Sequence, residues 1–412
     1  MNNQILPYKT KKSIKTERIG ILLVFSLVAI TGMEYFYRSQ YYILITFLFA
    51  SFFFIRYKRK VNKTFIFIII LFLIIEIFQY SMFGGFRLWT FSGSYIRLFL
   101  AYAVVTIVGR NFFTYYVKTI YFLSVISLLF YAASFLPGAE SFYLNVLCKL
   151  IPNPFESTKG FYKGSPNFIL FTVNYLFPEH RNSGPFWEPG AFAVFLMIAL
   201  LFNHIQERKI GTKVNIVFIV CLLTTFSTTG FLAFFVFIFY LNLDLIRKNI
   251  FYTIVFSGVL FSSYYIYENT LFLKDKITEN ISLADETTTS RFGSAKADLE
   301  EFYRSPIVGL GRAGAKDGFV SASNFTVENH RNNGVFNLLA TYGLPLTLIY
   351  FYLIFNTFFR IETAYNISKY YPWAAFIIIL ILGFSQGLFL KPFFYAFLFL
   401  PPVLTNKRKY TF

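Results

Sequence analysis

Long apolar runs separated by short charged segments constrain this chain more than any other feature of its sequence. Only 14% of its 412 residues are charged, whereas a soluble globular protein carries about 25% charged residues on the surface it shows to water. About 20 apolar residues suffice for a helix to cross a membrane. The apolar runs lie near residues 19–33, 41–55, 64–83, 95–109, 113–136, 188–205, 212–243, 250–267, 334–358, 373–389 and 391–404. The sequence therefore predicts an all-α, polytopic membrane protein.

The run 212–243 decides the predicted topology. Treated as two helices that turn at residues 227–230, it gives about twelve transmembrane helices with both termini inside the cell. Short inside segments then hold 21 basic residues, and only Arg38, Arg87 and Lys391 fall in short outside loops. This excess fits the positive-inside rule. Orientation in a membrane thus accounts for the net charge of +18, and a nucleic-acid partner is not expected.

The same topology leaves two long extracytoplasmic loops, at about 137–187 and 268–333, within a single integral membrane domain spanning 1–412. Loops of this length are usually functional. In the second loop, the apolar spacing over 290–304 predicts an amphipathic helix that ends at Ser305-Pro306. A short interfacial helix is expected over 139–151.

Several familiar motifs are absent or lie in the wrong context. Residues 309–314 match the dinucleotide fingerprint, but no strand precedes them. We expect a glycine-rich turn there, or a loop whose N–H groups approach a phosphate beside Arg312. The aspartates are scattered, and the three histidines form no spaced ligand pair. The prediction is no metal and no cofactor.

Two polar segments at the outer ends of predicted helices carry the candidate chemistry. His330 lies among Asn and charged residues just before a membrane helix, where it could accept a proton from a sugar hydroxyl or simply be a solvated part of a helix cap. Arg181 could bind an anion in fork geometry or snorkel to lipid headgroups. Glu188, at a helix start, could favour the dipole or pair with Arg181.

The order of these segments resembles the O-antigen polymerase and O-antigen ligase superfamily of bacterial surface-polysaccharide assembly. The resemblance covers roughly residues 180–350. Its motifs are Arg181-x-x-Gly184 with Glu188-Pro189-Gly190, Thr225-x-Ser227-Thr228, Arg291, Pro306-x-x-Gly309-x-Gly311, His330-x-Asn332 and Gly343-Leu344-Pro345.

The resemblance implies a glycosyltransferase C type of fold that acts without metal on undecaprenyl-pyrophosphate-linked sugars, outside the cytoplasmic membrane. By motif position, Arg181 and Arg291 correspond to pyrophosphate-binding arginines and His330 to the catalytic histidine. The chain departs from the family pattern at Ser227-Thr228, where Ser-Arg is common, and at His330-Arg331-Asn332, where His-Asn is common. We therefore expect Arg312 or Arg331 to supply the missing charge.

The leading hypothesis is a polysaccharide polymerase that transfers a growing lipid-linked glycan onto a lipid-linked repeat unit. A ligase that sends the same donor to a lipid A core is the alternative within the family. A flippase or other transporter of lipid-linked sugars is a more distant one. The expected partners are undecaprenyl-pyrophosphate-linked oligosaccharides and membrane lipid, with a polysaccharide chain-length regulator as a further candidate. The expected location is the bacterial inner membrane, with the active site on its periplasmic face.

Overall fold

The computed structural model describes most of the chain as helix. The residues it describes are 14–37, 39–84, 88–151, 166–173, 180–249, 258, 291–312 and 332–405. Within them there is no β-strand, and the extended contacts are two isolated bridges, Met33 with Phe186 and Asn167 with Thr172. The predicted all-α class is confirmed for this part of the chain.

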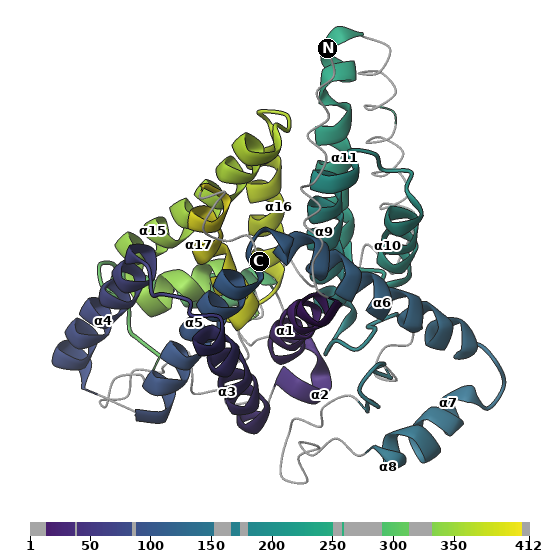
Figure 1. The fold of residues 1–412 in the computed structure, drawn as a ribbon, viewed down its shortest axis with the longest axis horizontal. Helices are drawn as coiled ribbons and strands as arrows, with labels where there is room; N and C mark the ends of the chain where they lie inside the picture. The colour runs from purple at the N-terminus through teal and green to yellow at the C-terminus, as the bar shows by residue number, and fades with distance from the viewer. Residues whose placement is uncertain are drawn as a thin grey trace.

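The helices follow the apolar runs of the sequence. In chain order they are α1 (Ile14–Gly32), α2 (Glu34–Tyr37), α3 (Gln40–Arg56), α4 (Lys63–Phe83), α5 (Leu88–Val108), η1 (Gly109–Asn111), α6 (Phe112–Ala133), α7 (Ala139–Phe142), η2 (Tyr143–Leu147), α8 (Cys148–Leu150), α9 (Pro189–Glu207), α10 (Lys213–Thr224), α11 (Thr228–Lys248), α14 (Arg291–Arg304), α15 (Gly334–Tyr365), α16 (Tyr371–Ser385) and α17 (Pro392–Thr405) (Figure 1).

Five helical segments of the described chain are long and apolar enough to cross a membrane. They are Lys63–Phe83, Leu88–Ala133, Pro189–Glu207, Thr228–Lys248 and Gly334–Tyr365. The helices α3, α10, α16 and α17 are apolar but shorter. The run 250–267 lies outside the described residues except for residue 258. The fold is thus that of a helical membrane protein, and the count of twelve spans stays a prediction.

The long apolar run 212–243 is broken at residues 225–227, and the last three residues of the predicted turn 227–230 form the start of α11. Helix α10 ends at Thr224 and α11 begins at Thr228, with Ser227 as N-cap, whose side chain accepts a hydrogen bond from the Gly230 N–H at 3.2 Å. Phe226 adopts a φ of +47°, which sharpens the turn. Both helices pack against α9. A serine N-cap after a short apolar helix is therefore enough to divide the run.

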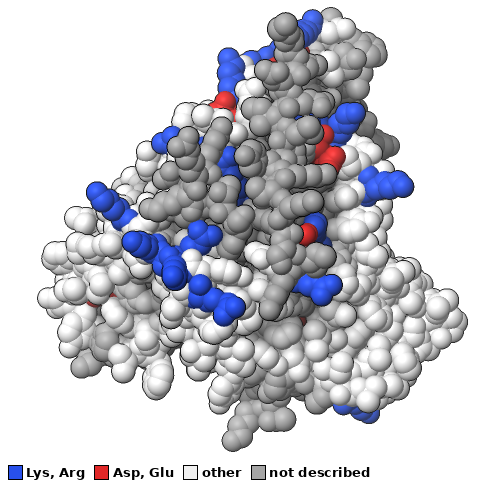
Figure 2. Space-filling view, viewed as in Figure 1, with Lys and Arg blue, Asp and Glu red and all other residues white. Residues whose placement is uncertain are grey.

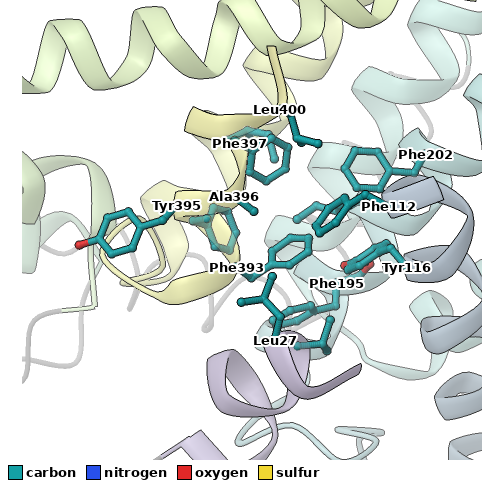
Figure 3. Close-up of a cluster of buried hydrophobic side chains, with 14 of the residues drawn as sticks. Leu27, Phe112, Tyr116, Phe195, Phe202, Phe393, Tyr395, Ala396, Phe397 and Leu400 are labelled. Carbon is teal, nitrogen blue, oxygen red and sulfur yellow. The ribbon is translucent and has the colours of Figure 1, made fainter. Parts of the chain in front are cut away.

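The core is an aromatic cluster between α17, α6 and α9 (Figure 3). The Phe393 ring of α17 stacks on the Tyr116 ring of α6 with centroids 4.8 Å apart, and Phe113 and Phe202 meet at the same separation. Helix α9 is buried along nearly its whole length. Because α9 and α17 are held by these contacts, the residues at their N-terminal ends are fixed in position.

The two predicted loop helices are present where described. Helix α14 covers the predicted amphipathic segment and ends just before Ser305-Pro306, and α7, η2 and α8 cover 139–150. The buried face of α14 is polar and includes Asp298 and Glu301, whereas Phe292 and Tyr303 are exposed. An interfacial helix turns its apolar face to lipid, so this orientation fits a helix lying at the membrane surface.

Basic side chains are unevenly distributed over the molecule. On the face shown in Figure 2, most Lys and Arg side chains lie in the upper part. The lower part, which includes the region of α7 and α8 (Figure 1), carries fewer of them. This asymmetry agrees with the predicted inner and outer ends of the helices, and which end faces the cytosol remains a prediction.

Candidate functional site

Three side chains from three distant segments meet at the N-terminal end of α9. Glu188 is the N-cap residue of α9, but its carboxylate makes no capping bond. The carboxylate instead accepts a hydrogen bond from Gln386 Nε2 and forms an ion pair with Arg291, whose Nη2 lies 3.6 Å from Glu188 Oε1. We call Glu188, Arg291 and Gln386 the Glu188 cluster. It joins two segments that the sequence identified as motifs to one that it did not.

The N-terminal end of α15 packs against the same place. The Asn333 side chain caps α15 by accepting hydrogen bonds from the backbone N–H groups of Val335 and Phe336, both at 3.1 Å. A Cβ on Gly334 would collide with the Gln386 carbonyl, so only glycine allows α15 to start this close to α16. The predicted base, His330, lies four residues earlier in the chain and outside the described residues, as does Arg331.

Aromatic packing fixes α14 beside the Glu188 cluster. The ring centroids of Phe292 and Phe384 are 5.1 Å apart, and those of Phe336 and Phe384 are 6.3 Å apart. Phe384 stands two residues before Gln386, and Phe292 follows Arg291. Edge contacts between aromatic rings therefore hold α14 in place, so that Arg291 lies next to Glu188.

The electrostatics of the Glu188 cluster favour an anion. The N-terminal ends of α9 and α15 carry the positive ends of their helix dipoles. Arg291 Nη1 is buried and has no hydrogen-bond partner among the described residues. A guanidinium with unused donors at helix N-termini is suited to bind a phosphate in fork geometry.

Arg181 is held differently. Its Nε donates to the Thr225 carbonyl at 3.0 Å and its Nη2 to the Phe226 carbonyl at 3.2 Å. The neighbouring Asn182 is buried and donates to Thr224 Oγ1 at 3.0 Å. The structure thus brings together the motifs around Arg181 and Thr225, and it gives Arg181 an anchoring role at the C-terminal end of α10. It does not pair Arg181 with Glu188, the pairing left open by the sequence.

A second cation, Lys391, contacts Trp187, the residue that precedes Glu188 in the chain. The Lys391 ammonium is 3.7 Å from the centroid of the Trp187 ring and 4.7 Å from that of Tyr37. Lys391 immediately precedes α17 and follows the short segment that begins at Gln386. Cation–π contacts with two rings fix an ammonium that the positive-inside rule disfavours on the outer side.

The glycine-rich turn predicted at residues 309–314 is confirmed over its described part, 309–312. Gly309 and Gly311 have φ values of +69° and +76°, and the Gly311 N–H donates to the Thr341 carbonyl at 3.0 Å. Gln79 also donates to Thr341 O, at 2.8 Å. These bonds use carbonyls freed where α15 kinks at Gly343, whose φ is +71°. The glycines therefore dock the loop against a broken helix, and their N–H groups bond to protein carbonyls.

Arg312, at the end of this turn, enters the helical bundle. It donates to Ser94 Oγ at 2.6 Å and to the Tyr395 hydroxyl at 2.9 Å. In Figure 3 the Tyr395 side chain points away from the aromatic core. Burial lowers the pKa of Arg312, but the nearby Tyr342, Tyr395 and Glu76 outweigh this effect and raise it above its ordinary value. Arg312 is thus a charged residue outside the Glu188 cluster.

Two further polar residues, His180 and Gln386, lie near the predicted outer end. His180 is exposed, and its ring lies 5.4 Å from that of Phe135. Sequence reasoning missed Gln386, whose signal was a polar Ser-Gln-Gly step inside an otherwise apolar region. The polar residues described near the predicted outer end therefore form three groups: the Glu188 cluster with Lys391, the anchored Arg181, and Arg312, which is bonded inside the bundle.

The helices, the polar clusters at their ends and the asymmetric charge define a polytopic membrane protein with a candidate anion site. Residues 214–351 match the model of the O-antigen ligase family. This match supports the resemblance to the O-antigen polymerase and O-antigen ligase superfamily that the sequence motifs indicated. The match indicates a membrane enzyme of glycosyl transfer in polysaccharide biosynthesis and does not distinguish polymerase from ligase. No curated protein matches the chain.

Proposed function

We propose that the protein is a polysaccharide polymerase of the inner membrane that works without metal on its periplasmic face. Its donor is a growing glycan on undecaprenyl pyrophosphate, and its acceptor is a lipid-linked repeat unit. The single observation that carries this proposal is the Glu188 cluster. It holds the Arg291 guanidinium near the N-terminal ends of α9 and α15. Helix α15 begins four residues after His330.

In this proposal the reaction is a displacement at the anomeric carbon of the donor sugar. The acceptor hydroxyl oxygen forms the new bond to that carbon while the bond to the pyrophosphate oxygen breaks. The electron pair leaves with the pyrophosphate, and His330 takes the hydroxyl proton. Arg291 stabilises the charge that develops on the leaving group, an effect worth several kcal/mol in a poorly hydrated site. Glu188 and Gln386 orient Arg291.

The experiment is transfer by purified protein in a bilayer with lipid-linked repeat units as the sole substrate. A polymerase converts them into a ladder of longer lipid-linked glycans and releases undecaprenyl pyrophosphate. A ligase needs a lipid A core acceptor and gives no ladder without it. Transfer that appears only after the core acceptor is added would replace the polymerase proposal by the ligase alternative. Transport of lipid-linked sugar without any new glycosidic bond would favour the flippase.

A further inference from the structure

A second group of charged residues lies inside the bundle, next to the segment that carries Gln386. Arg312 of this group donates to the Leu390 carbonyl at 3.5 Å, besides its bonds to Ser94 and Tyr395. Residues 386–391 therefore touch the Glu188 cluster at Gln386 and this second group at Leu390. The two groups are neighbours across one short turn.

Glu76 of α4 is the carboxylate of the second group. Tyr95 donates to Glu76 Oε2 at 2.7 Å and Tyr342 donates to Oε1 at 3.4 Å. Glu76 also lies within electrostatic range of Arg312. The described residues of α4, α5, α17 and the turn 305–312 contain no other acidic side chain.

Arg97 of α5 is the second cation. It stands one helical turn after Ser94, on the same face, and Ser94 binds Arg312. Arg97 lies within electrostatic range of Arg312, Tyr342 and Tyr395, yet it forms no hydrogen bond or ion pair with another described residue. It is about 13 Å along the helix from the first residue of α5. We call Glu76, Arg97 and Arg312 the Arg97 cluster.

The charges of the Arg97 cluster do not balance among the described residues. The cluster holds two guanidinium groups and one carboxylate among apolar helices, where ionisable side chains usually mark a functional site. Arg97, Arg312 and Glu76 each keep part of their surface exposed. An anion of charge one or two would complete the site.

We propose that the Arg97 cluster binds the pyrophosphate of a second lipid-linked substrate, the acceptor, while the Glu188 cluster binds that of the donor. This inference rests on the proposed function. A polymerase joins two substrates that both end in lipid pyrophosphate, and two cationic clusters joined by residues 386–391 provide one site for each. A ligase needs one such site, so the Arg97 cluster also bears on the choice between the two activities.

The test is the stoichiometry of binding of undecaprenyl pyrophosphate itself, measured by native mass spectrometry and titration in nanodiscs without anionic lipid. We expect two molecules per wild-type chain and one per chain for Arg97→Gln, with the remaining molecule lost on the further change Arg291→Gln. The matched control is Arg247→Gln. Arg247 is an exposed arginine stacked 4.6 Å from the Tyr370 ring, and this variant should bind two.

A second variant keeps the test decisive if Arg97→Gln fails to fold. Glu76→Gln removes the only carboxylate of the Arg97 cluster and retains a group that can accept from Tyr95. It should bind the second molecule several-fold more tightly, whereas a merely structural role predicts weaker binding. The melting temperature of each variant reports its folding.

Every other outcome overturns the inference. One molecule per wild-type chain, or two per chain in well-folded Arg97→Gln, removes the second site and leaves the proposed function in place. A site that depends on Arg97 but prefers phosphatidylglycerol over undecaprenyl pyrophosphate is a phospholipid headgroup site. If wild-type protein binds no undecaprenyl pyrophosphate, the proposed function fails together with the inference.

Discussion

The cations at the two ends of the bundle stand in opposite relations to the helices. At the predicted inner end, Arg208 donates to the Asn366 carbonyl at 3.1 Å and to the Tyr365 carbonyl at the end of α15, and Arg110 donates to the Leu404 carbonyl near the end of α17. At the predicted outer end, Arg291 pairs with Glu188 at the N-terminal end of α9, and Lys391 stands at the N-terminal end of α17. The first arrangement is favoured by the helix dipoles and the second is disfavoured.

This difference separates arginines that hold the fold from cations placed for a ligand. An arginine at a helix C-terminus satisfies carbonyls that the helix leaves open, so the fold alone explains it. A cation at a helix N-terminus adds to a positive potential and becomes favourable when an anion arrives. By this criterion Arg181 belongs with Arg208, although it lies at the outer end, because it donates to carbonyls that follow α10.

The comparison fails outright if both ends lie on the same side of the membrane. Gly387 and Gly211 are exposed, and a Cβ on either meets no atom within 4 Å. With Cys148 replaced by serine and Cys221 left in the core, an impermeant thiol reagent applied to intact spheroplasts should label Gly387→Cys and leave Gly211→Cys unlabelled until lysis. Labelling of both, or of Gly211→Cys alone, would contradict the assigned ends.

His330→Ala tests the chemistry assigned to the outer end. Removing a positioned base should lower turnover by about 10²- to 10⁴-fold. His180→Ala is the matched control, because the His180 ring is exposed and contacts Phe135. Turnover should be followed with purified protein and lipid-linked substrate. Near-normal turnover of His330→Ala would leave charge stabilisation by arginine as the main catalytic device.

Gln386→Leu should have a smaller effect, since Gln386 acts through Glu188. Without its hydrogen bond, the Glu188 carboxylate is free to turn away from Arg291, and kcat/KM should fall by about ten- to a hundredfold. Gln206→Leu, an exposed glutamine at the other end bonded to Thr114 at 3.2 Å, serves as the control. Equal activities of the two variants would remove Gln386 from the site.

Arg181→Lys should have the smallest effect on transfer. Lysine cannot reproduce the two bonds to Thr225 and Phe226, so the melting temperature should fall, while transfer per folded molecule should fall less than about tenfold. The check combines thermal unfolding with transfer normalised to folded protein. A loss of transfer without a loss of stability would return Arg181 to the pyrophosphate role that the family resemblance implies.

The helices were predictable from the sequence because they depend on local pattern. The apolar runs, the Ser227 cap and the amphipathic spacing over α14 each involve residues close in the chain. The contact of Gln386 with Glu188 joins residues 198 positions apart, and no local pattern encodes it.

The glycine-rich turn shows the same limit. Its turn character was readable from Gly309 and Gly311, but its partner was not, because the carbonyls it uses become open only when α15 kinks at Gly343. Likewise, the sequence could assign Arg181 to an outer loop but could not show that the carbonyls of Thr225 and Phe226 hold its guanidinium.

The most direct test of the account compares one arginine from each end. Arg291→Lys and Arg208→Lys should be purified, shown to be folded, and assayed for single-unit transfer from lipid-linked substrate. Loss of the fork geometry at the leaving group should lower turnover of Arg291→Lys by about 10²- to 10³-fold. Arg208→Lys should stay within about twofold of wild type, because a lysine can still serve a helix C-terminus. Equal turnover of the two variants would contradict the assignment of the Glu188 cluster as the donor site.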